Sequence, residues 1–154
     1  MSRVTFSIWL AELGGIGKSP FASGTVATIL VGIPAAYLLA FAPPTWAAVF
    51  LLLALFPISC YVSEITERQL DRIDPKEIVI DELLGYLVTV VGFQVNWKSL
   101  LIGLILFRLF DIFKPWPVNL LNKETQGGIW IVLDDIGAGC YARLVLWMIL
   151  SIWS

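Results

Sequence analysis

Histidine is absent from the 154 residues of this sequence. Its absence excludes Ser-His-Asp and Cys-His nucleophile systems, because both need an imidazole to move a proton. It also excludes HExxH zinc sites and phosphatases that work through a phosphohistidine intermediate. The two cysteines, Cys60 and Cys140, lie in apolar runs and indicate neither a disulfide framework nor a zinc site.

Charged residues are scarce as well. They make up 14% of the sequence, whereas hydrophobic residues make up 58% and the mean hydropathy is +0.86. Soluble domains contain about 25% charged residues, so this composition is typical of a polytopic membrane protein. The net charge of −2 provides no basic surface, and we expect no nucleic-acid partner.

Five apolar runs are present, at 25–40, 46–62, 83–93, 100–110 and 136–153. A membrane-spanning helix needs about 20 residues, so the third and fourth runs are short and are alternatively partly re-entrant. Backbone groups in lipid must be satisfied within helices or closed barrels, and no run alternates as a barrel strand does. We predict one all-α domain over 1–154, a polytopic membrane helix bundle with about four to five transmembrane helices.

The segments between the runs differ in charge. Residues 41–45 and 94–98 are short and carry one charge, Lys98, whereas 2–24, 63–82 and 114–135 are long and charged. With five spans in alternation, the charged segments share one side, which the positive-inside rule makes cytoplasmic. We therefore expect the active site at the cytoplasmic face.

The first segment, 2–10, is open to two interpretations. Phe6, Trp9 and Leu10 would form the apolar face of an interfacial helix. The alternation of apolar residues from 4 to 10 would instead suit a strand, and we favour the helix.

Residues 13–25 read LGGIGKSPFASGT. Glycines allow a backbone to approach an anion and point N–H groups at it, and the segment adds one lysine and several hydroxyls. It is not a Walker A loop, because Glu12 stands where that pattern needs glycine. We predict substrate binding here, against the alternative of a flexible connector capped by Thr25. The residues assigned to phosphate binding are Gly17, Lys18, Ser19, Gly24 and Thr25.

Two pairs of adjacent carboxylates enter apolar runs, Asp81-Glu82 and Asp134-Asp135. Such pairs are difficult to explain as solvated surface, and without a cation their members would repel each other.

Between the pairs lies RLFDIFKPWPV, in which Arg108, Asp111 and Lys114 recur every three residues. On a helix this spacing gives one polar stripe, and the prolines that follow end the helix. The alternative is a structural ion pair between Arg108 and Asp111.

Together these segments bring five carboxylates to the cytoplasmic ends of three predicted spans. Oxygen-rich sites without histidine or thiolate favour Mg²⁺, Mn²⁺ or Ca²⁺. We predict metal ligation by these five carboxylates, catalysis by them with Lys114, and phosphate binding by Arg108. The five are Asp81, Glu82, Asp111, Asp134 and Asp135.

In order and approximate spacing, GIGKSPFASGT, DPKEIVIDE, RLFDIFKPWPV and GGIWIVLDDIGAG resemble the phosphatidylglycerophosphatase A family. The resemblance implies a Mg²⁺-dependent phosphatase of the bacterial inner membrane. Such an enzyme removes the terminal phosphate of its partner lipid, phosphatidylglycerophosphate, to give phosphatidylglycerol. The resemblance places the family's acidic residues on the five carboxylates and its basic residue on Lys114. It places the end of the family's glycine-rich loop on Gly24 and Thr25.

Three positions depart from that family pattern. Ser23 replaces a common proline, Trp130 replaces a small residue, and Arg143 stands where a neutral residue is usual. We expect Arg143 to extend toward the membrane surface or to pair with a carboxylate.

The expected chemistry is metal-assisted hydrolysis. The attacking group is either a metal-bound water, which we favour, or an aspartate that forms an acyl-phosphate. Two rival functions are a phospholipid head-group phosphotransferase, whose DGxxAR pattern is missing, and a small cation transporter, whose charges should lie near the bilayer midplane.

Overall fold

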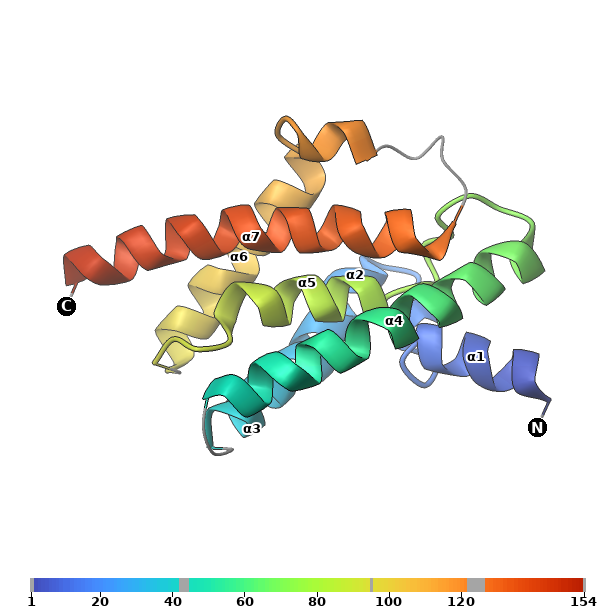
Figure 1. Cartoon of the computed structure of the whole chain (residues 1–154), viewed down its shortest axis with the longest axis horizontal. Helices are drawn as coiled ribbons and strands as arrows, with labels where there is room; N and C mark the ends of the chain where they lie inside the picture. Colours follow the sequence, from blue (N-terminus) through green and yellow to red (C-terminus); the bar gives the residue numbers. More distant parts are fainter. Residues whose placement is uncertain (1, 42–44, 95, 122–126, 154) are drawn as a thin grey trace.

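The computed structural model of the chain describes residues 2–41, 45–94, 96–121 and 127–153. Every regular element in these ranges is helical, which confirms the predicted all-α fold (Figure 1). The longer helices are α1 (Arg3–Ala11), α2 (Ser23–Ala27), α3 (Ile33–Phe41), α4 (Thr45–Leu70), α5 (Ile80–Val90), α6 (Trp97–Phe113) and α7 (Gly128–Trp153). The short turns are η1 (Ile16–Lys18), η2 (Thr28–Gly32) and η3 (Val118–Leu121).

The first segment is helical, so its interpretation as a strand is wrong. Ser2 caps α1, because its Oγ accepts a hydrogen bond of 3.1 Å from the backbone N–H of Thr5. The helix packs against α4 and buries Ala11, while Phe6 and Trp9 remain exposed. This division of faces suits a helix that lies at a membrane interface.

The first apolar run forms one continuous helical path from Ser23 to Phe41. Its middle section, η2, is a π-helical turn that ends just before Pro34. Proline has no N–H, and its ring crowds the carbonyl four residues earlier, which here belongs to Leu30. A wider turn at this point relieves the crowding without ending the helix.

Three helical stretches are long and apolar enough to cross a membrane, judged by length and composition: Ser23–Ala40, Trp46–Leu70 and Gly128–Ile152. The helices of the third and fourth runs, α5 and α6, contain 11 and 17 residues. Both are shorter than the roughly 20 residues of a typical span. The described part of the chain thus provides three helical stretches that could span a membrane and, in the third and fourth runs, two shorter helices.

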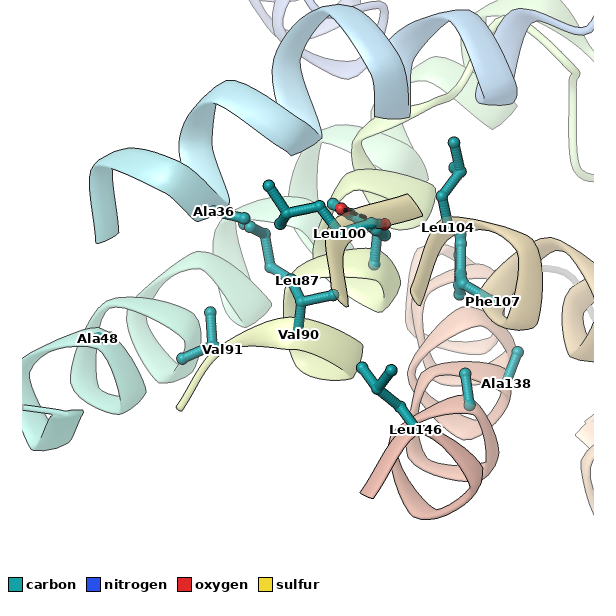
Figure 2. Packing of buried hydrophobic residues seen from close by; sticks show 12 residues of the cluster. Ala36, Ala48, Leu87, Val90, Val91, Leu100, Leu104, Phe107, Ala138 and Leu146 are labelled. Atoms are coloured by element: carbon teal, nitrogen blue, oxygen red, sulfur yellow. Dashed lines mark hydrogen bonds between the residues drawn. The ribbon is translucent and has the colours of Figure 1, made fainter. Parts of the chain in front are cut away.

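The short helix α5 is central to the packing. Figure 1 shows it between α4 and α7, with α6 crossing α7. Helix α5 packs against α4, α6 and α7, and α7 packs against α4 and α6 as well. Leu87 and Val90 pack with Phe107 of α6 and Leu146 of α7 (Figure 2). Tyr86 is fully buried, and its hydroxyl donates a hydrogen bond of 3.1 Å to the Leu100 carbonyl.

Two glycines allow α5 and α7 to touch through their backbones. A Cβ added at Gly139 would lie 2.4 Å from the Gly85 carbonyl oxygen. One added at Gly85 would lie 2.6 Å from the carbonyl oxygen of Asp135. No larger residue fits at either position without moving one helix away from the other.

The C-terminal end of α5 is held by Arg143 of α7. Its Nη1 donates to the carbonyls of Val88 and Val91, at 3.0 and 2.6 Å, and its guanidinium lies 4.6 Å from the centre of the Phe93 ring. No carboxylate among the described residues pairs with Arg143, so the expected carboxylate partner is wrong. The reason is the shortness of α5, which ends at Val90 and leaves carbonyls that need donors.

Candidate active site

A cavity of about 450 Å³ lies where α5 begins, α6 ends and α7 begins. The connector between α4 and α5 contributes to its wall. All six residues that we predicted as catalytic line it, together with Arg108. The lining residues are Asp74, Lys76, Ile78, Asp81, Glu82, Arg108, Asp111, Ile112, Lys114, Ile131, Asp134 and Asp135.

The first turn of α5 supplies Asp81 and Glu82. Carboxylates are favoured at a helix N-terminus, where the unpaired N–H groups carry partial positive charge. Asp81 is buried, with 5% of its surface exposed. The Glu82 carboxylate lies against Gly24 of α2, where an added Cβ would be 1.7 Å from its Oε1. Gly24 therefore leaves the space that Glu82 occupies.

The last turns of α6 supply Arg108 and Asp111. Arg108 Nη1 lies 3.0 Å from Glu82 Oε1 and 2.8 Å from Asp111 Oδ2, so it bridges two carboxylates from different helices. The ion pair between Arg108 and Asp111 is thus present. Both residues also line the cavity, so the ion pair does not exclude a functional role for them.

Lys114 closes α6 and reaches α7. Its backbone has a φ of 42°, a left-handed conformation that turns the chain out of the helix before Pro115. Its Nζ forms an ion pair with Oδ2 of Asp134. This contact joins the end of α6 to the carboxylate pair of α7.

Two glutamates of α4 hold the N-terminus of α7. Glu67 Oε2 accepts from the Gly127 N–H at 2.8 Å, and Glu64 Oε2 accepts from the Gly128 N–H at 2.6 Å. Negative side chains at this end interact favourably with the helix dipole, and they also accept hydrogen bonds from the free N–H groups of the first turn. They fix the start of α7 less than two turns before Asp134.

Four carboxylates of the cavity each have one buried oxygen without a hydrogen-bond partner. These atoms are Asp81 Oδ1, Glu82 Oε2, Asp134 Oδ1 and Asp135 Oδ2. Among the described residues, the lining has six carboxylates against three cations, Lys76, Arg108 and Lys114, so these residues carry an excess of negative charge. An all-oxygen donor set with unsatisfied buried atoms fits a hard divalent cation. Among the described residues, however, no three acidic or cysteine side chains are already gathered as a metal-binding group.

The glycine-rich segment lies beside the cavity rather than in its lining. Gly17 packs against the connector, because an added Cβ would be 2.0 Å from the Glu77 carbonyl oxygen. Lys18 is exposed and pairs with Glu12 at 2.9 Å, and the Ser19 hydroxyl donates to the Phe21 carbonyl. Of the residues assigned to phosphate binding in this segment, Gly24 contacts a cavity side chain. Gly17, Lys18, Ser19 and Thr25 do not line the cavity.

Sequence reasoning missed Asp74 and Lys76, which also line the cavity. Both belong to DPKEIVIDE, directly before the acidic pair, so their place in that motif was the available signal. Three isoleucines, at 78, 112 and 131, complete the lining and could not be distinguished from other apolar residues.

Comparison with known proteins identifies the protein family of this chain. The family model described as Phosphatidylglycerophosphatase A matches residues 9–150. The chain belongs to this family. Every segment that lines the cavity falls within the matched range.

Curated relatives agree with membership of the phosphatidylglycerophosphatase A family. A Phosphatidylglycerophosphatase A of Escherichia coli K12 is 32% identical over 140 residues, which cover 90% of this chain and 80% of the relative. One from Haemophilus influenzae Rd is 32% identical over 95 residues, 61% of this chain and 58% of the relative. A Bacteroides thetaiotaomicron protein, provisionally named a phosphatidylinositol-3-phosphatase, is 30% identical over 153 residues, 95% of each chain. No solved structure matches the chain.

Proposed function

We propose that this protein is a Mg²⁺-dependent lipid phosphatase that hydrolyses phosphatidylglycerophosphate to phosphatidylglycerol and phosphate, in phospholipid biosynthesis. The observation that carries the proposal is the cavity, in which the acidic pairs of α5 and α7 meet Arg108 and Lys114. Membership of a family of phosphoric monoester hydrolases supports the same reaction.

The residues that would hold Mg²⁺ are the five predicted carboxylates. Asp81, Glu82, Asp134 and Asp135 each offer an unpartnered buried oxygen, and Asp111 already shares Arg108 with Glu82. When bound, the cation supplies positive charge that offsets the charge developing on the phosphate oxygens.

The basic residues of the cavity have a complementary role. Arg108 and Lys114 are each paired with carboxylates and are largely buried, with 21% of either side chain exposed. A phosphate that enters between these pairs meets donors already fixed in place, which lowers the reorganisation needed during the reaction. The Ile112 side chain, exposed beside them, offers an apolar surface to the rest of the lipid.

We propose a multi-pass arrangement in the bacterial inner membrane with the cavity facing the cytoplasm. Beside the three long apolar stretches, α5 and α6 would bring the number of spans to five. The end of α4 and the connector after it carry Arg68, Arg72 and Lys76 on the cavity side, whereas Lys98 is the charge at the start of α6. This distribution follows the positive-inside rule. The gathering of carboxylates at one end of the helices argues against a transport pathway, which would need them near the midplane.

The test is phosphate release from phosphatidylglycerophosphate in mixed detergent micelles. We expect purified protein to release phosphate with Mg²⁺ and to stop when a chelator is added. The variant Asp81→Asn should retain less than about a hundredth of the activity, because one carboxylate of the site is lost. Folded wild-type protein that releases no phosphate in Mg²⁺ would refute the proposed reaction.

A second candidate substrate is phosphatidylinositol 3-phosphate, favoured by the relative from Bacteroides thetaiotaomicron that matches almost the whole chain. Both lipids present a phosphomonoester on a head group that a phosphodiester joins to diacylglycerol. Comparing kcat/KM for the two lipids in the same micelles decides between them, and we expect the higher value for phosphatidylglycerophosphate.

A further inference from the structure

Three cations among the described residues line the cavity, and they differ in what they contact. Arg108 is engaged by Glu82 and Asp111, and Lys114 is engaged by Asp134. Lys76 lines the same cavity, is exposed, and forms no ion pair with any residue that the structure describes. Its charge is therefore available to a ligand.

The backbone of Lys76 is held firmly. Its carbonyl accepts a hydrogen bond of 2.8 Å from the Ser23 hydroxyl, which comes from the segment 53 residues earlier. Buried Pro75 closes the turn, since its carbonyl accepts from the Ile78 N–H at 2.9 Å. Ser23 stands where the family pattern commonly has proline, and proline could not donate this bond.

The residue after Lys76 is fixed as well. Glu77 pairs with Arg72 at 2.8 Å, and its carbonyl lies against Gly17. Burial alone would raise the pKa of Glu77, but the hydrogen bond and charge of Arg72 together lower it, so the pair stays ionised near neutral pH. The connector thus holds Lys76 at a defined point of the cavity rim.

We propose that Lys76 binds the phosphodiester of the lipid substrate while the terminal phosphate lies among the deeper carboxylates. The inference rests on the proposed function and names a substrate contact within it. A bilayer lipid keeps its phosphodiester at the membrane interface, where a long lysine side chain can reach it with the ammonium group still hydrated. The more enclosed Arg108 and Lys114 remain for the phosphate that is removed.

The lipids named for the relatives share the required chemistry. Phosphatidylglycerophosphate and phosphatidylinositol 3-phosphate differ in the alcohol between the two phosphates, yet each has a phosphodiester on the lipid side of its phosphomonoester. A cation that binds the phosphodiester would select this class of lipid over a phosphomonoester attached directly to diacylglycerol.

The first test compares the kinetics of three variants on phosphatidylglycerophosphate in mixed micelles. Lys76→Gln should raise KM about tenfold and leave kcat within about twofold, because a charged hydrogen bond to the bound substrate is lost. Lys76→Arg should stay close to wild type. Lys98→Gln, the same change at the start of α6 and away from the cavity, should alter neither constant. An unchanged KM for Lys76→Gln, or a loss confined to kcat, would overturn the inference.

Product inhibition separates the phosphodiester from the transferred phosphate. Phosphatidylglycerol has the phosphodiester alone, whereas inorganic phosphate resembles the group that is released. Lys76→Gln should weaken inhibition by phosphatidylglycerol about tenfold and leave inhibition by inorganic phosphate unchanged. Equal weakening of both would place Lys76 on the reacting phosphate and overturn the inference.

These outcomes differ from failure of the proposed function. If wild-type protein does not hydrolyse phosphatidylglycerophosphate, the reaction itself is refuted. If wild type is active and Lys76→Gln behaves identically in both assays, the reaction stands and the Lys76 contact alone is wrong.

Discussion

Among the described residues that line the cavity, carboxylates outnumber the basic side chains that could balance their charge. Each of Asp134 and Asp135 has one buried oxygen without a partner, but Asp134 also pairs with Lys114, whereas Asp135 forms no ion pair with a described residue. Without a bound cation, Asp134 thus stabilises the fold through its ion pair, whereas the neighbouring Asp135 does not. The proposed role of Asp135 in metal binding would explain why an unpaired carboxylate is retained there.

That difference predicts opposite effects of the same substitution at neighbouring positions. Asp135→Asn should raise the free energy of unfolding by about 1–2 kcal/mol in chelator, because it removes an uncompensated buried charge. Asp134→Asn should lower the free energy of unfolding, because it leaves Lys114 without its partner. Thermal melting in detergent micelles measures both, and activity in Mg²⁺ should fall in each. Two variants with melting temperatures shifted in the same direction would contradict the assignment.

Gly24 provides a second prediction about single residues. Gly24→Ala would place a methyl group on the Glu82 carboxylate and push it away from Arg108. We expect kcat to fall about a hundredfold, since small displacements in an active site are costly. The double variant Gly24→Ala/Glu82→Asp, with a shorter acid, should recover part of the loss. A single variant with wild-type kcat would show that Glu82 can move without consequence.

Among the helices, α5 depends on its neighbours for both ends. Its first turn carries Asp81 and Glu82, and its last carbonyls are satisfied by Arg143 from α7. A helix of 11 residues buried among longer ones has few hydrogen bonds of its own to hold its position. The position of the acidic pair is therefore coupled to a contact at the opposite end of the helix.

The coupling predicts the behaviour of Arg143 variants. Arg143→Met should lower the free energy of unfolding by about 2 kcal/mol, since two hydrogen bonds from a charged donor are lost. It should also lower kcat, because α5 can then shift. Arg143→Lys should lose less, as an ammonium still bonds a carbonyl, and Arg3→Met serves as a control on exposed α1. Melting curves and initial rates in the same micelles test this, and an Arg143→Met variant with wild-type values for both would rule it out.

Sequence patterns predicted that the acidic residues lie together because each carboxylate stands at the border of an apolar helix. A charged side chain at such a border faces the polar end of the helix bundle. The patterns did not indicate that Lys76 rather than Lys18 lines the cavity, because the position of each lysine depends on how its segment packs. The Lys18 side chain pairs with Glu12 at the end of α1, whereas the Lys76 backbone is held by a hydrogen bond that its carbonyl accepts from the Ser23 hydroxyl. Arg143 could not be interpreted until the end of α5 was known.

Over the whole molecule, the functional groups are confined to one end and the α5–α6 turn lies away from them. Directly after that turn, at the start of α6, the Lys98 Nζ lies 5.8 Å from the centre of the Trp97 ring, an amphipathic pair suited to a membrane interface. Whether α5 and α6 cross the bilayer decides on which side this pair lies.

Cysteine labelling of intact cells tests the crossing. In a background with Cys60 and Cys140 replaced by alanine, Lys98→Cys should react with a membrane-impermeant maleimide from outside. Gln69→Cys, on the cavity side, should react only after the membrane is permeabilised. Lys98→Cys that also needs permeabilisation would show that α5 and α6 enter and leave by the same face.

For the proposed Mg²⁺ site, the contact between Gly85 and Gly139 has a consequence for which ion would fit. Gly85 lies one helical turn after Asp81, and Gly139 lies one turn after Asp135, so the backbone contact sets the separation of the two acidic pairs. Mg²⁺ binds oxygen at 2.0–2.1 Å and Ca²⁺ at roughly 2.3–2.6 Å, a difference smaller than the width of a methyl group. Two residues without a side chain, Gly85 and Gly139, would then set the discrimination between ions by radius. Replacing either glycine by alanine would separate the acidic pairs and favour Ca²⁺ over Mg²⁺.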